Sequence, residues 1–184
     1  MKRTTIGIII VAVLIVLYGF ATYNSLVTLN VNADTQWKQV ETQYQRRFDL
    51  IPNLVESVKG VMKQEQTVFT ALAEARTHYA GAATPDAKAR AAGEVESALG
   101  RLLVITENYP QLKSSDTVQT LMSQIEGTEN RISVERSRFN QTVQAYNLKV
   151  MRIPSSIIAS IFGFKTRAYF EAAKGAENAP QVKF

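Results

Sequence analysis

An apolar run from Ile6 to Phe20 is the feature that most constrains this chain, and no charged residue follows it until Asp34. The stretch from Thr4 to Tyr23 has about 20 residues, and a helix that adds ~1.5 Å per residue then crosses the ~30 Å hydrocarbon core of a bilayer. Backbone groups find no hydrogen-bond partner in lipid, so such a segment must be helical. The run predicts a membrane anchor that includes Ile6, Ile10, Leu14, Leu17 and Phe20.

The alternative for this run is a cleaved signal peptide, since Gly19 and Ala21 are small residues at the two positions that a signal peptidase reads. The run is long for a signal peptide, and helical sequence continues past it, so we favour a retained anchor. Lys2 and Arg3 precede the run, whereas only Lys38 follows it closely. By the positive-inside rule, we expect a single-pass protein of the cytoplasmic membrane, with its N-terminus cytoplasmic and the remainder on the outer side.

The amino-acid composition argues against several classes of function. The 184 residues contain no Cys and one His, and Lys+Arg 21 against Asp+Glu 16 give a net charge of +5 without a basic cluster. These counts argue against disulfide scaffolds, thiol chemistry and nucleic-acid binding. A di-iron bundle needs Glu-x-x-His motifs, but Glu74 lies four positions before His78. No phosphate-binding glycine loop or nucleophile elbow is present, so we expect no cofactor, no small-molecule substrate and no enzymatic activity.

Apolar residues beyond the anchor recur every three or four positions, which is typical of amphipathic helices. The longest register contains Val118, Leu121, Ile125, Thr128, Ile132, Glu135, Phe139, Val143, Tyr146 and Val150. An earlier stripe starts at Val27 and Val31 and continues through Trp37. Thr84-Pro85-Asp86 is a helix start with a capping residue, a proline in the first turn and an acid that complements the helix dipole. Because period-two runs bounded by hairpin turns are absent, the predicted class is all-α.

Pro52 decides the expected topology. If it only kinks a helix, that helix extends as a rod with most of its apolar stripe unpaired in water. If the chain turns at residues 48–50, Asp49 caps the next helix and Pro52 falls in its first turn, where a missing N–H costs nothing. We favour the turn. It predicts a tail at residues 1–5, a transmembrane helix at 6–23, an antiparallel up-and-down four-helix bundle at 24–150, and a short apolar helix with a tail at 151–184.

Several blocks of this sequence resemble the LemA family. The most specific block is Arg-Arg-Phe-Asp-Leu-Ile-Pro-Asn-Leu-Val at residues 46–55, and the tail Ile-Pro-Ser-Ser-Ile-Ile-Ala at 153–159 leads to Phe-Gly-Phe at 162–164. Tyr146-Asn147 is a further match. The resemblance covers nearly the whole chain. It implies a bacterial single-pass membrane protein with a helical bundle, linked to membrane-associated processes that include a magnetosome-forming branch, and without an established catalytic activity.

Two sets of charged residues are candidates for a role. Arg46 and Arg47 lie beside the expected turn, where they either complement a helix C-terminus or bind an acidic partner or a phosphate. Glu135 falls on the apolar register of the last long helix, so we expect it to be paired. Counting ~1.5 Å per residue from the far end of the bundle predicts a structural ion network. Its members are Glu65, Arg76, Arg90, Glu94, Arg131, Glu135 and Arg138.

The segment from Ile153 to Phe164 has too many large apolar residues for one narrow stripe. They are Ile157, Ile158, Ile161, Phe162 and Phe164. Such a surface packs on the bundle, meets another subunit or lies on the bilayer. In an antiparallel bundle the last long helix returns to the membrane, so our hypothesis is a membrane contact flanked by Arg152, Lys165 and Arg167.

Two functions fit these expectations. One is a membrane-tethered helical scaffold that acts by self-association or by binding a protein partner. The other is an adaptor or regulator of a membrane enzyme such as a protease. Exposed apolar patches on the bundle favour the first, and a single polar groove favours the second.

Overall fold

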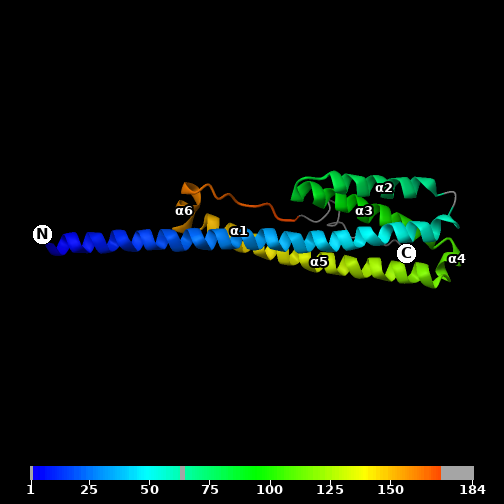
Figure 1. Cartoon of the computed structure of the whole chain (residues 1–184), viewed down its shortest axis with the longest axis horizontal. Coiled ribbons are helices and arrows are strands. Elements are labelled where there is room, and N and C mark those ends of the chain that lie inside the picture. Colours follow the sequence, from blue (N-terminus) through cyan, green and yellow to red (C-terminus); the bar gives the residue numbers. More distant parts are fainter. Residues whose placement is uncertain (1, 63–64, 171–184) are drawn as a thin grey trace, which may run out of the picture. The chain divides into compact units, whose positions relative to one another are not determined.

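The computed structural model describes residues 2–62 and 65–170, and all regular secondary structure in them is helical. The predicted all-α class is therefore confirmed, and the predicted tail beyond residue 170 lies outside the described residues. Figure 1 shows the order of the elements. The helices are α1 (Lys2–Lys59), α2 (Gln66–Gly81), α3 (Pro85–Thr106), α4 (Pro110–Lys113), α5 (Asp116–Met151) and α6 (Ser155–Ile161).

Two compact units divide the chain. The anchor unit is built from the described part of Met1–Lys38 together with Arg136–Tyr169, and the bundle unit is built around Gln39–Glu135. The boundaries between the units therefore fall inside α1 and α5, and the anchor unit combines two stretches that are far apart in the sequence. The division expected at residues 24 and 150 stays a prediction.

The buried face of α1 is a seam with alternating steps of four and three residues. From Gly19 to Val58 every seam position is buried or half-buried. Counting back from Trp37, the seam passes through Ala33, Asn30 and Leu26. The expected positions Val27 and Val31 are instead 37% and 52% exposed, so the start of that stripe was misplaced by one or two residues. The sequence reading preferred large valines, but the spacing requires the small Ala33 at the buried position.

Helix α1 continues through Pro52, so the turn expected at residues 48–50 was wrong. Proline inside a helix costs roughly 3 kcal/mol or more. The seam explains why the helix continues, because Phe48, Ile51 and Leu54 on both sides of Pro52 are at most 3% exposed. Burying large apolar side chains gains ~1.5–3 kcal/mol for each. Helix α1 ends at Lys59, immediately before Gly60, and the next helix begins at Gln66.

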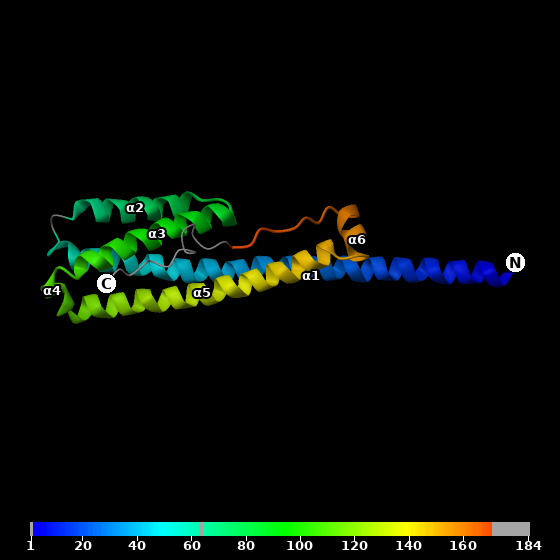
Figure 2. The same cartoon turned by 180° about the vertical axis from the view of Figure 1, so that it is seen from behind.

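Consecutive long helices of the bundle unit reverse direction, and α2 lies alongside α3 in both views (Figures 1 and 2). The start of α3 is capped as expected, because the Thr84 hydroxyl accepts a hydrogen bond from the Ala87 backbone N–H at 3.2 Å. In α5, every residue of the expected register from Val118 to Val150 is buried or half-buried. The spacing rule therefore placed the buried face of this helix correctly over its whole length.

Candidate functional site

The N-terminal part of α1 has the properties of a membrane span. It is the one described helix long and apolar enough to cross a membrane, with a mean hydropathy of 2.5 in its most apolar 18-residue window. No residue of that window is buried within the protein. The predicted anchor residues Ile6, Ile10, Leu14, Leu17 and Phe20 are each between 54% and 66% exposed. A soluble protein would normally bury side chains of this kind in its core.

Helix α6 packs against α1 where the apolar run ends (Figure 1). The Phe162 ring lies 4.8 Å from the Tyr23 ring, centroid to centroid. A Cβ placed on Gly19 would lie 3.8 Å from Cδ1 of Ile158. Leu26 and Ala159 are buried in the same apolar cluster. Gly19, Tyr23 and Leu26 all lie on the α1 seam. The α6 segment therefore packs on this face of α1 along two helical turns.

A glycine turn directs the chain back after α6. The Phe164 backbone N–H donates to the Ala159 carbonyl at 2.9 Å, and the Gly163 N–H donates to the Ser160 carbonyl at 3.3 Å. Gly163 has a φ of 75°, which favours glycine. As a result the Phe164 ring also reaches Tyr23, at 5.8 Å. The Phe-Gly-Phe sequence thus supplies two aromatic contacts to one position of α1.

Asn147 fixes the segment that follows this turn. Its side chain is 3% exposed, donates to the Arg167 carbonyl at 2.9 Å and accepts from the Arg167 N–H at 2.8 Å. The Arg167 guanidinium reaches Asp34 of α1 at 2.7 Å and lies 5.8 Å from the Tyr146 ring. Burial raises the pKa of the Tyr146 phenol, and Arg167 partly offsets the effect of burial. The Tyr-Asn pair of α5 therefore holds the C-terminal segment against the anchor unit.

A pocket of about 440 Å³ lies between α1, the end of α5 and the start of α6. Its polar lining consists of Tyr18, Lys149, Arg152 and Ser155. Its apolar lining consists of Leu29, Ala145, Leu148, Ile153 and Pro154. Among the described residues, two cationic side chains and no acidic one line this cavity, beside large aliphatic groups. We refer to it as the α1–α5–α6 pocket.

Arg47 is the central ionic residue of the bundle unit. It is 1% exposed, although it is adjacent to the exposed Arg46. Its Nε donates to Thr128 Oγ1 at 3.1 Å, and its two terminal nitrogens reach Glu96 at 3.5 Å and Glu129. The guanidinium thereby connects α1 with α3 and α5. A contact between Arg47 and a binding partner was one of our expectations, and this burial argues for a role inside the bundle instead.

The residues of the expected ion network lie in several places. Glu94 is 2.7 Å from His78, and the Tyr109 hydroxyl donates to Glu65 at 3.4 Å. Glu135 is half-buried on the α5 seam, as its register predicts. The network's arginines are on the surface, namely Arg76, Arg90, Arg131 and Arg138. Arg47 was expected beside a turn and was not included in the ion network, although it lies three residues after Tyr44 and four before Ile51 on the seam.

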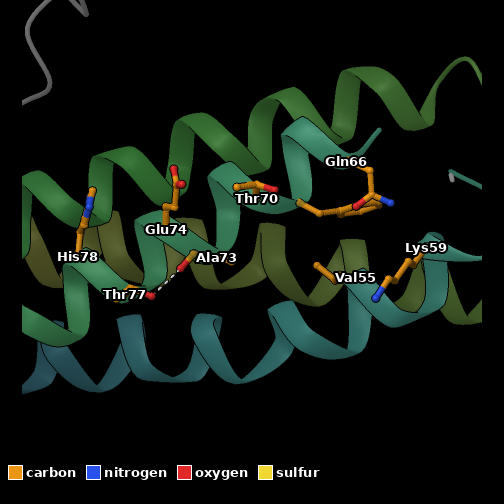
Figure 3. Close-up of a pocket in the computed structure, with 9 residues that line it drawn as sticks. Val55, Lys59, Gln66, Thr70, Ala73, Glu74, Thr77 and His78 are labelled. Carbon is orange, nitrogen blue, oxygen red and sulfur yellow. Dashed lines mark hydrogen bonds between the residues drawn. The ribbon is translucent and has the colours of Figure 1, made fainter. Parts of the chain in front are cut away.

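A second cavity of about 440 Å³ lies between α1 and α2 in the bundle unit. Figure 3 shows the lining residues Val55 and Lys59 on α1, and Gln66, Thr70, Glu74 and Thr77 on α2. Phe69, Ala73 and His78 complete the lining. This α1–α2 groove is open and chemically mixed, which suits contact with a polypeptide more than enclosure of a small molecule.

An aromatic cluster lies beside these features. The rings of Phe48 and Tyr79 are 4.4 Å apart, and the rings of Tyr44 and Tyr79 are 5.5 Å apart. Burial raises the pKa of the Tyr79 phenol, and the nearby Glu41 carboxylate raises it further. Among residues 2–62 and 65–170, no group of three or more His, Asp or Glu side chains is placed to hold a metal ion.

The fold and these surfaces define an all-α protein with one candidate membrane span and a helical bundle. The chain belongs to the LemA family, which matches residues 36–184. Magnetosome protein MamQ 2 and Magnetosome protein MamQ 1 of Paramagnetospirillum magneticum are each 28% identical to it, over 90% of this chain and 72% of the relative. Magnetosome protein MamQ of Magnetospirillum gryphiswaldense is 29% identical, over 80% of this chain and 64% of that protein.

Proposed function

We propose that this protein is a membrane-anchored helical interaction protein of the bacterial cytoplasmic membrane and has no catalytic activity. The observation that carries the proposal is the continuity of α1. This helix starts as an exposed apolar segment and continues without a break into the bundle unit, where its seam is buried. One element therefore joins a candidate span to a protein module, and membership in the LemA family supports a membrane-associated role.

The proposed orientation has the N-terminus in the cytoplasm and the later helices on the outer side. Lys2 and Arg3 before the apolar run support it, since cationic residues are retained on the cytoplasmic side. The chain has no cysteine, so single cysteines can report on each end.

The test introduces Lys113→Cys or Thr4→Cys and treats intact spheroplasts with a membrane-impermeant maleimide. We expect labelling at position 113, an exposed residue at the end of α4, and none at position 4 until the membrane is permeabilised. The reverse pattern overturns the orientation. Release of the protein from membranes by alkaline carbonate overturns the anchoring itself.

An adaptor or regulator of a membrane enzyme is the second candidate, and the α1–α2 groove favours it. In the part of the bundle unit that the structure describes, the exposed large apolar side chains are Val61, Val104 and Val134, whereas the groove combines Val55 and Phe69 with Lys59 and Glu74. Scattered valines give little support to self-assembly through this unit. If the full chain in nanodiscs is monomeric by mass photometry, the adaptor is favoured. A dimer or larger species that persists on dilution favours the self-associating scaffold.

A further inference from the structure

We propose that α6 and the α1–α5–α6 pocket form a binding site for an acidic phospholipid at the outer surface of the membrane. The inference rests on the proposed function, because it requires α1 to cross the bilayer. It adds a ligand class and a location: the phosphate is held by Lys149 and Arg152, and the exposed apolar residues of the α6 segment enter the interfacial layer.

The depth of α6 follows from its contacts. Gly19 and Tyr23 lie at the C-terminal end of the ~20-residue segment that crosses the bilayer, and both are contacted by the α6 segment through Ile158 and Phe162. Leu26, which also contributes to this cluster, is ~10 Å along α1 from Gly19. An element packed on these positions lies at the boundary between hydrocarbon and headgroups when α1 spans the membrane.

The exposed surface of this segment is apolar. Ile153 is 84% exposed, Ile161 is 67% exposed, and Ile157 and Phe162 are 58% and 57% exposed. Four large apolar side chains within ten residues would be unfavourable in water, whereas an interfacial helix buries such side chains at the acyl boundary. Arg152 and Lys165 flank the segment in sequence and are also exposed. Cationic side chains beside an interfacial helix are attracted to anionic lipid headgroups.

The pocket provides the polar part of the site. Lys149 and Arg152 come from the last turn of α5 and the residue after it, and Tyr18 comes from α1. No carboxylate from residues 2–62 or 65–170 lines the cavity. A phosphate diester carries one negative charge and accepts several hydrogen bonds, which Lys and Arg side chains can donate. Leu29, Leu148 and Ile153 offer apolar contact to the rest of the lipid. An acidic phospholipid combines both chemistries, and free phosphate supplies only one of them.

The junction between α5 and α6 is held in place. The Ser155 hydroxyl lies 2.7 Å from the Lys149 carbonyl and 2.8 Å from the Arg152 carbonyl, within hydrogen-bond distance of both. Ser155 is 4% exposed. The backbone that carries both cations is therefore fixed before a ligand arrives, which lowers the entropy lost on binding.

The first experiment measures ligand class with the full chain in neutral maltoside micelles. Calorimetric titration uses dihexanoyl phosphatidylglycerol, dihexanoyl phosphatidylcholine and inorganic phosphate as separate probes. We expect phosphatidylglycerol to bind roughly tenfold or more tightly than phosphatidylcholine, because each cation near a phosphate contributes several-fold in affinity. The K149Q/R152Q variant should lose this preference. The matched R101Q/K113Q variant, which removes two exposed cations of the bundle unit, should keep it.

The second experiment measures depth in vesicles of phosphatidylcholine and phosphatidylglycerol. A polarity-sensitive fluorophore is attached to F162C, I157C or, as the control, V104C, whose valine is 64% exposed. We expect brominated lipids to quench the first two labels at least severalfold more than the third.

Three results overturn the proposal. They are equal phosphatidylglycerol affinity for wild type and K149Q/R152Q, inorganic phosphate binding as tight as that of the lipid, and a label at position 162 that is not quenched. Loss of oligomers in Ile157→Asn together with an unquenched label would assign the surface to a second copy of the chain. Carbonate extraction of the same samples tests α1 separately. A retained protein without lipid preference contradicts only this inference, and an extracted protein contradicts the proposed function.

Discussion

Among the described residues of the bundle unit the exposed large apolar side chains are three separate valines, whereas the anchor unit exposes two concentrated sets, at residues 6–20 and 151–162. The charged residues differ as well. The bundle unit buries a guanidinium between three helices, and the anchor unit uses Arg167 at its edge to pair with Asp34. The bundle unit thus follows the rules of a water-soluble helical core. The surface of the anchor unit is suited to an environment that is partly apolar.

The comparison is tested most strongly at Arg47. Arg47→Ala should lower the free energy of unfolding by about 3 kcal/mol, because it removes a buried guanidinium that pairs with Glu96 and Glu129 and donates to Thr128. The measurement is thermal and urea unfolding of the full chain in micelles, followed by circular dichroism.

Arg46→Ala is the matched control, since it removes the same side chain one residue earlier at an exposed position. Its effect should stay within about 0.5 kcal/mol. If both variants lose the same free energy of unfolding, Arg47 is no more important to the bundle unit than an exposed charge, and the comparison fails.

A smaller effect is expected at Asn147 in the anchor unit. Asn147→Ala removes both hydrogen bonds to the Arg167 backbone and should weaken the attachment of the C-terminal segment by about 1–3 kcal/mol. The segment contains Lys165 and Arg167, so trypsin should cleave there several times faster than in wild type. Gln144→Ala, at an exposed position on the same helix, should leave the rate unchanged. Cleavage at wild-type rate in Asn147→Ala would show that the Tyr-Asn pair does not hold this segment.

The smallest expected effects are at two glycines, and they have opposite signs. A Cβ at Gly163 or at Gly127 meets no atom within 4 Å, so packing is not the cause of either effect. Gly163→Ala should destabilise by about 1 kcal/mol, because its φ of 75° disfavours a side chain. Gly127→Ala should stabilise by roughly 0.5–1 kcal/mol, because that glycine lies inside α5. Melting temperatures that move in the same direction would contradict the backbone argument.

Sequence spacing predicted the helices well where one register continues without interruption, as on α5 from Val118 to Val150. It failed at Pro52. Proline usually ends or kinks a helix, but the buried residues on both sides of Pro52 stabilise a continuous α1. Hydropathy identified both exposed apolar segments, residues 6–20 and the segment after Ile153, and contact of the second segment with a membrane stays a prediction. The role of Asn147 was not predictable, because its partner is the backbone of a residue twenty positions later, for which spacing gives no signal.

The division of the anchor unit between the two ends of the chain determines the order in which it can be completed. Residues 19–37 of α1 leave the ribosome early, but their partners at residues 139–167 are made more than 100 residues later. At synthesis rates of about 5–20 residues per second, the first helix waits several seconds for them. In the proposed anchoring, lipid surrounds the apolar segment during that interval, and the contacts of Phe162 and Phe164 with Tyr23 form later, on a helix that has already inserted.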